Sequence, residues 1–113
     1  GMSGHCAHQF VEEAGGNIYP CDFYCTDEYV LGNFHDTDFD AMATGKTAVE
    51  FLKESLPIPD KCRTCRFYPI CRAGGCKRTR QSADYCEAYQ KFFSACLPLF
   101  RVFLSEQPTK LTK

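Results

Sequence analysis

The spacing of the cysteines constrains this chain more than any other feature of its sequence. Residues 61–76, KCRTCRFYPICRAGGC, hold four of the nine cysteines in a chain of 113 residues. Nine cysteines are about 8% of the chain, a level at which cysteine chemistry, rather than core burial alone, holds a fold together. Three classes of site use so many sulfurs in so short a space: a disulfide framework, a zinc site and an iron–sulfur site.

The first residues of the chain argue against a disulfide framework. Residues 1–6, GMSGHC, lack the apolar region of a signal peptide, and no segment approaches the roughly 18 apolar residues of a membrane span. We therefore expect a cytoplasmic protein without a membrane partner, and in a reducing cytoplasm clustered cysteines more often bind metal than form disulfides. An odd number of cysteines also leaves one thiol over. Gly1 looks like a scar of tag removal, and residues 1–5 are assigned to this scar and a lead-in.

Length and composition predict one folded domain. With 44% hydrophobic and 24% charged residues the chain is typical of a globular protein, and a net charge of −1 gives no support to nucleic-acid binding. Residues 17–24 and 28–34 are β-prone and predict a hairpin joined through residues 25–27. The prolines of residues 56–60 predict an extended linker.

Two helical regions are predicted around the cysteine-rich stretch. Residues 35–55 are helically patterned, with a capping residue among positions 36–38 and a division at Gly45. Residues 82–104 carry one apolar stripe, with Ser82 as a cap and a kink or split at Pro98. Residues 61–80 are too rich in Cys, Gly and Arg for regular structure. We predict a small metal-stabilised α+β domain over residues 6–104: an N-terminal hairpin, short helices, a cysteine knuckle and a C-terminal helix closing over it, followed by a polar tail over residues 105–113.

The cysteines of the knuckle, residues 61–80, favour two metal centres over one. Its spacing is C-x2-C-x5-C, with a fourth cysteine five residues later and a fifth ten residues after that. A zinc knuckle usually repeats the close pair or adds histidines near its second half, whereas the three histidines, His5, His8 and His35, all precede it. One zinc ion would leave three or more of these cysteines unexplained, and iron–sulfur clusters take four thiolates each. Residues 61–80 also hold seven Lys or Arg and no Asp or Glu. Such a run stabilises an anionic cluster or meets a neighbouring domain; a solvated surface and a nucleic-acid patch are the alternatives.

These spacings resemble a known family, the SPASM domain, the C-terminal auxiliary-cluster domain of radical S-adenosylmethionine enzymes that modify peptides and proteins. In CAHQFVEEAGGNIYPC, nine residues separate the first cysteine from Gly16 and four separate Gly16 from the second, as in the family. The stretch CRTCRFYPICRAGGC and the later Cys86 complete the pattern over residues 6–86. The segments YPCDFY, LGN, GGC and YCEAY look most like the anaerobic sulfatase-maturating branch, whose members convert a Cys or Ser of a sulfatase into formylglycine.

The resemblance implies two [4Fe–4S] clusters and a catalytic role for one carboxylate. The first cluster would be ligated by Cys6, Cys21 and Cys76, with a fourth cysteine that stands upstream of residue 6 in that branch. The second cluster would be ligated by Cys62, Cys65, Cys71 and Cys86. Asp22 matches the base proposed to deprotonate the substrate side chain. The implied partners are a radical S-adenosylmethionine core domain, in cis or in trans, and a sulfatase or other peptide substrate.

The chain also departs from this family pattern. Four residues, not three, separate Cys71 from Cys76, and Cys25 and Cys96 lie outside the pattern. Cys96 is expected to be a buried core thiol, and Cys25 either a hairpin thiol or a surrogate cluster ligand, a role also open to His5 or His8. The C-x3-C-x2-C loop that holds the catalytic cluster is absent from these residues, so S-adenosylmethionine would act only through the missing core and the chain should not catalyse alone. The alternative function is a zinc-stabilised binding module without a redox role, and zinc is also a substitute metal in an aerobic preparation.

Overall fold

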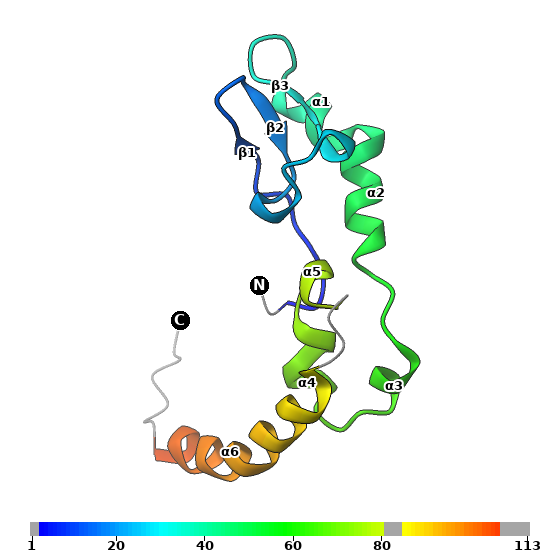
Figure 1. Ribbon diagram of the computed structural model, residues 1–113. Coiled ribbons are helices and arrows are strands. Elements are labelled where there is room, and N and C mark those ends of the chain that lie inside the picture. The colour runs from blue at the N-terminus through cyan, green and yellow to red at the C-terminus, as the bar shows by residue number, and fades with distance from the viewer. Residues whose placement is uncertain (1–2, 81–84, 107–113) are drawn as a thin grey trace. The chain divides into compact units, whose positions relative to one another are not determined.

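The computed structural model describes residues 3–80 and 85–106 (Figure 1). The chain divides into two compact units, residues 1–82 and residues 83–113. The first unit contains a small antiparallel sheet and a series of short helices, and the second contains one long helix. This is the predicted α+β class.

The sheet has three strands in the order β1–β2–β3: β1 (Val11–Glu12), β2 (Asn17–Tyr19) and β3 (Gly32–Asn33). The predicted pairing of the two β-prone segments is confirmed, since β2 and β3 run antiparallel with Asn17 opposite Asn33. Strand β1 was not predicted, because two residues are too few to show a period of two. It joins β2 through a turn in which Gly16 has a φ of 86°, a conformation that glycine adopts without steric cost.

The connection between β2 and β3 is longer than the predicted hairpin turn. Strand β2 ends at Tyr19, immediately before Pro20, which supplies no N–H for a sheet. Two 3-10 helices follow, η1 (Asp22–Tyr24) and η2 (Asp27–Tyr29), where the sequence predicted strand. These two turns matter for packing, because they place the ring centroids of Tyr24 and Tyr29 at 5.3 and 5.8 Å from the centroid of the Phe51 ring.

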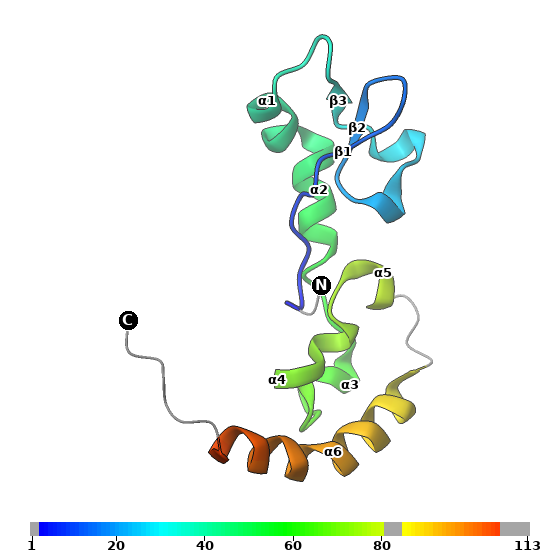
Figure 2. The same ribbon diagram turned by 90° about the vertical axis from the view of Figure 1, so that its left-hand side faces the viewer.

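The predicted pair of helices divided at Gly45 is confirmed. Helix α1 (Phe39–Thr44) begins after Asp38, whose side chain accepts hydrogen bonds from the backbone N–H groups of the first turn. Helix α2 (Lys46–Glu54) lies alongside the sheet in both ribbon views (Figures 1 and 2). The core of this region consists of side chains that are at most 3% exposed: Ile18, Tyr19, Met42, Ala48 and Phe51.

The prediction that residues 61–80 lack regular structure was wrong. This stretch forms single helical turns: α3 (Asp60–Arg63), α4 (Tyr68–Cys71), the 3-10 turn η3 (Arg72–Gly74) and α5 (Lys77–Arg80). Turns of three or four residues are too short to produce a helical periodicity in a sequence. Cys62 and Phe67 are buried here, at 8% and 4% exposure.

The second unit contains α6 (Cys86–Glu106), the helix that the apolar stripe predicted. It runs through Pro98 as a single element, so the predicted split is not found, although proline still removes one intrahelical hydrogen bond. Phe93 is the buried large side chain of this helix at 7% exposure, and Cys96 is half-buried rather than the fully buried thiol that we expected. The predicted cap, Ser82, lies outside the described residues.

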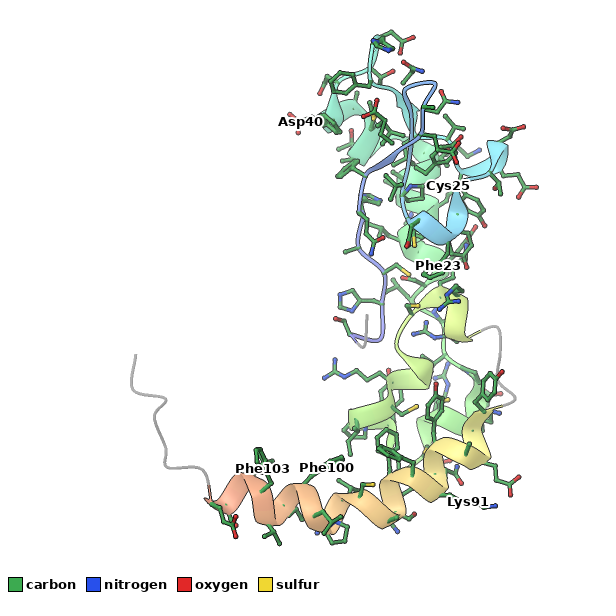
Figure 3. The ribbon with its side chains drawn as sticks, turned by 60° about the vertical axis from the view of Figure 1, so that its left-hand side comes forward. Phe23, Cys25, Asp40, Lys91, Phe100 and Phe103 are labelled. Carbon is green, nitrogen blue, oxygen red and sulfur yellow. The ribbon has the colours of Figure 1, made fainter. Side chains whose placement is uncertain are left out.

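The predicted stripe of α6 is largely exposed in the structure. The exposed members are Tyr85, Tyr89, Phe92, Leu99 and Phe103, and Figure 3 labels Phe100 and Phe103 on this helix. Within the residues that the structure describes, no helix combines the length and the apolar character needed to cross a membrane. The domain boundaries at residues 6 and 104 and the packing of the last helix on the knuckle remain predictions.

Candidate metal centre

Cys6 lies on an N-terminal segment that long-range hydrogen bonds hold in place. Its backbone N–H donates to the Oγ of Ser55 at 2.9 Å, and Ser55 is completely buried. Two residues earlier, Gly4 donates its N–H to the Gly75 carbonyl at 2.8 Å and accepts from an Arg80 guanidinium nitrogen at 2.5 Å. These contacts bring a segment from the start of the chain beside residues 75–80.

Cys21 follows β2 and immediately precedes η1. The Gln9 N–H donates to the Pro20 carbonyl at 2.8 Å, which ties this point to the N-terminal segment. The Cys21 thiol donates to Oδ1 of Asp22 at 3.3 Å. Burial raises the pKa of the Cys21 thiol, and the Asp22 carboxylate raises it further against a lowering contribution from the Phe23 N–H. A metal that binds this sulfur must therefore displace its proton.

Cys76 follows a tight turn that absorbs the extra residue after Cys71. Arg72 and Ala73 both have left-handed φ values, 49° and 57°, and Gly74 and Gly75 follow with φ values of 85° and 97°. The Gly75 N–H closes the turn by donating to the Arg72 carbonyl at 3.1 Å. Left-handed conformations of non-glycine residues cost on the order of 1–2 kcal/mol each, so this turn is held by its surroundings. With four residues after Cys71 in place of three, Cys76 still lines the cavity that Cys6 and Cys21 share.

Cys6, Cys21 and Cys76 line one cavity of about 220 Å³ in the first unit. The same cavity is lined by Asp22 and by His5, two further residues with ligand or acid–base chemistry. Phe23, labelled in Figure 3, also lines it, and the guanidinium carbon of Arg78 lies 3.7 Å from the centroid of the Phe23 ring. The structure thus brings three distant cysteines, which the family resemblance assigns to one cluster, to the wall of one cavity.

The cavity is not a preformed site for a single metal ion. Within residues 3–80 and 85–106, no three His, Cys, Asp or Glu side chains are arranged so as to hold a metal ion. A tetrahedral zinc ion with Zn–S distances of about 2.3 Å needs its sulfurs roughly 3.8 Å apart. A four-iron cluster has a wider requirement, because each of its irons takes its own thiolate. The cavity is thus lined by thiols of the kind that ligate either metal group.

The knuckle cysteines are arranged by local turns. The Cys65 N–H donates to the Cys62 carbonyl at 3.4 Å, and the Cys71 sulfur accepts the N–H of Gly74 at 3.4 Å. Cys86 begins α6 in the second unit. Its membership of the same site as Cys62, Cys65 and Cys71 remains a prediction.

The remaining thiols and imidazoles differ in their surroundings. All nine cysteines lie in the described residues, and the structure contains no disulfide among them. The Cys25 thiol donates to the Cys21 carbonyl at 3.6 Å, and among the described residues Cys25 is not part of the cavity lining. His8 shares a hydrogen bond of 3.0 Å with the Ala48 carbonyl through Nε2. Of the three candidate surrogate ligands, only His5 therefore lines the cavity.

The basic run of residues 61–80 contacts rings and carbonyls of the first unit. Arg80 donates to the Ser55 and Pro57 carbonyls, in the segment that follows α2, and Arg72 donates to the Ser3 carbonyl at 3.1 Å. Lys77 is only 6% exposed and pairs with Glu54. Burial alone lowers the pKa of Lys77, but the hydrogen bonds to Glu54 and Tyr29 outweigh it and the pKa is raised.

Sequence reasoning missed Lys77, Arg78 and Phe23 as individual residues near the site. It counted both cations only as part of the basic run. A buried lysine has no sequence signal, because lysine is almost always exposed and its aromatic neighbours are distant along the chain. A cysteine followed directly by two cations, C-K-R at residues 76–78, was the one local sign.

Comparison with known proteins yields a family and a branch. The family model SPASM, an iron–sulfur cluster-binding domain, matches residues 6–66. A cysteine-type anaerobic sulfatase-maturating enzyme of Clostridium perfringens is 37% identical over 106 residues, covering 87% of this chain and 28% of the relative. A serine-type anaerobic sulfatase-maturating enzyme of Bacteroides thetaiotaomicron is 29% identical over 107 residues, covering 86% of this chain and 26% of the relative.

Solved structures give the same likeness. "Native anSMEcpe with bound AdoMet" superposes with a TM-score of 0.89 at 34% identity, covering 95% of this chain and 31% of that chain. "Native anSMEcpe with bound AdoMet and Cp18Cys peptide" has a TM-score of 0.85 at 35% identity, covering 95% of this chain and 32% of that one. This chain therefore spans less than a third of the length of the relatives and structures that it matches.

Proposed function

Because the chain belongs to the SPASM family of iron–sulfur cluster-binding domains, we propose that it holds two auxiliary [4Fe–4S] clusters for a radical S-adenosylmethionine enzyme of the sulfatase-maturating kind. The single observation that carries this proposal is the cavity lined by Cys6, Cys21 and Cys76. Those residues are 15 and 55 positions apart in sequence order, and the fold alone brings them to one wall.

The first cluster would be held by Cys6, Cys21 and Cys76. Hydrogen bonds from the N–H groups of neighbouring residues would reach its thiolates, since the Lys77 N–H already donates to the Cys6 sulfur at 3.5 Å. Such donors stabilise anionic sulfur and set the reduction potential of a cluster. The fourth ligand is left open between His5 and a cysteine upstream of residue 6.

The second cluster would be held by Cys62, Cys65, Cys71 and Cys86. The Gly74 N–H, which donates to the Cys71 sulfur at 3.4 Å, would serve this site as the Lys77 N–H serves the first. When bound, the two clusters would supply a route for the electron released after hydrogen-atom abstraction from the substrate.

Asp22 would accept the proton of the substrate side chain. It is exposed, lines the cavity and accepts a hydrogen bond from the Cys21 thiol. Metal ligation converts that thiol into a thiolate, which has no proton to donate, so an Asp22 oxygen is left to accept from another donor. A Cys thiol or Ser hydroxyl of a bound sulfatase peptide would provide that donor. The peptide would reach Asp22 from the cavity side.

The whole reaction requires a radical S-adenosylmethionine core domain, in cis or in trans. The chain would contribute substrate binding and electron transfer to that core, and Asp22→Asn separates cluster binding from the proposed proton transfer. This variant should load iron like the wild type, yet lose turnover of a sulfatase peptide when combined with the core domain.

Anaerobic reconstitution of the 113-residue chain with iron and sulfide tests the proposal. We expect brown protein with about eight irons per chain, four for each cluster. Cys6→Ala and Cys65→Ala should each retain about four irons, whereas Cys96→Ala, outside the pattern, should retain the wild-type content. Colourless protein with one or two zinc ions and no affinity for iron would instead favour the zinc-stabilised binding module.

A further inference from the structure

The side chain of Lys77 lies in a cage of aromatic rings. Its ammonium nitrogen is 4.8 Å from the ring centroids of both Tyr24 and Tyr29 and 5.1 Å from that of Phe51. It also pairs with Glu54 of α2 and donates to the Tyr29 hydroxyl at 3.0 Å. Lysine is rarely buried, and here cation–π contacts and a charged partner offset the loss of hydration.

The cage and the cavity share a wall. Tyr24 and Phe51, two of the three rings around Lys77, also line the cavity. On the chain, Lys77 directly follows Cys76, so fixing its side chain restrains the adjacent cysteine. Its backbone N–H donates to the Cys6 sulfur at 3.5 Å. Lys77 therefore contacts Cys6 through its backbone N–H and is the sequence neighbour of Cys76.

We propose that Lys77 is a positioning residue for the first cluster site. Its caged ammonium holds Cys76 against the cavity, and its backbone N–H orients the sulfur of Cys6. This inference rests on the proposed function, because it requires that Cys6, Cys21 and Cys76 ligate one cluster. The side chain of Lys77 contacts Glu54 and the rings of Tyr24, Tyr29 and Phe51. Two of these rings line the cavity, so we expect the effect at the first site.

The test compares Lys77→Met with three reference proteins after anaerobic reconstitution. Methionine keeps the length and apolar stem of lysine and removes the cation. Lys77→Arg keeps the cation, and Lys53→Met removes an exposed lysine of α2 as a matched control. Cys6→Ala supplies the spectrum of a chain that lacks the first cluster. The measurements are iron per chain, the electron paramagnetic resonance spectrum of the reduced protein, and the reduction potential of each cluster.

We expect Lys77→Met to lose about half of its iron and to give the spectrum of Cys6→Ala. The potential of its remaining cluster should be that of the wild type. Lys77→Arg should regain most of the lost iron, with a shifted potential for the first cluster only, and Lys53→Met should match the wild type throughout.

Two results would overturn the inference. In the first, Lys77→Met keeps the wild-type iron content and both potentials. In the second, Lys77→Met and Lys77→Arg both lose the two clusters in equal proportion, which would make Lys77 a general stability residue. A wild-type chain that takes up no iron would overturn the proposed function itself, and the wild-type iron content alone reports that failure.

Discussion

The two groups of cysteines in the first unit are positioned in different ways. Cys62, Cys65 and Cys71 lie within ten residues, and single helical turns set their spacing. Cys6 and Cys76 meet Cys21 at one cavity only because buried groups far away in the sequence, including Ser55, hold their segments. The comparison teaches that tertiary packing positions the cysteines of the cavity, whereas local backbone turns position those of the knuckle. Loss of core packing should therefore damage the first site more than the second.

The largest effect is expected from Phe51→Ala. Phe51 is 1% exposed, packs against Tyr24 and Tyr29, and lines both the Lys77 cage and the cavity. Removing a buried phenylalanine costs about 3–5 kcal/mol of unfolding free energy. Denaturant unfolding of the metal-free chain measures this loss, and iron analysis should show the first cluster depleted before the second.

Leu56→Ala is the matched control for that experiment. Leu56 is 62% exposed, so its removal should change the unfolding free energy by less than about 0.5 kcal/mol. Equal depletion of the two clusters in Phe51→Ala would contradict the distinction between the sites.

A smaller effect is expected from Ser55→Ala. Its hydroxyl accepts from the Cys6 N–H and donates to the Leu52 carbonyl at 2.6 Å, and the residue is completely buried. Leaving the Cys6 N–H without that acceptor costs about 1–3 kcal/mol. Thermal unfolding measures the loss, and we also expect weaker iron retention at the first site during challenge with a chelator. Ser105→Ala, whose hydroxyl donates to the Val102 carbonyl on exposed α6, should leave both readouts unchanged.

Asp38→Ala sharpens the comparison by lowering stability away from either site. The Asp38 carboxylate caps α1 by accepting from the Asp40 N–H at 2.7 Å. Loss of an N-cap costs about 1 kcal/mol. The unfolding midpoint should fall while the iron ratio of the two sites stays at the wild-type value, and Asp38→Asn should preserve the midpoint. A changed ratio would mean that global stability alone decides which site loads.

The smallest effect concerns pH. Burial raises the pKa of the Cys21 thiol, so the folded metal-free chain favours the neutral thiol. The corresponding stability is fully present below the ordinary cysteine pKa of about 8.5 and is lost as pH rises through the raised value. Metal-free wild type should therefore lose stability between about pH 8 and about pH 10 more steeply than Cys21→Ala. Identical slopes in denaturant titrations across that range would contradict it.

The sequence predicted helix boundaries correctly where the residues that determine a boundary lie within one short segment. Gly45 divides two helices and Asp38 caps the first of them, because backbone entropy and capping act within one turn. The missed elements were the shortest ones, β1 and the turns of the knuckle. The apolar stripe of residues 82–104 correctly predicted helix α6, and the packing of this helix on the knuckle remains a prediction.

By itself, the sequence determined the family, the α+β class and the set of cysteines, because spacings along a chain are preserved whatever its fold. The tertiary structure decided which distant residues share a wall. It placed His5 on the cavity, turned His8 to the Ala48 carbonyl, and buried Lys77 among three rings. The reason is physical: burial and long-range hydrogen bonds depend on how segments pack, and packing sums many weak contacts between residues that no sequence pattern pairs.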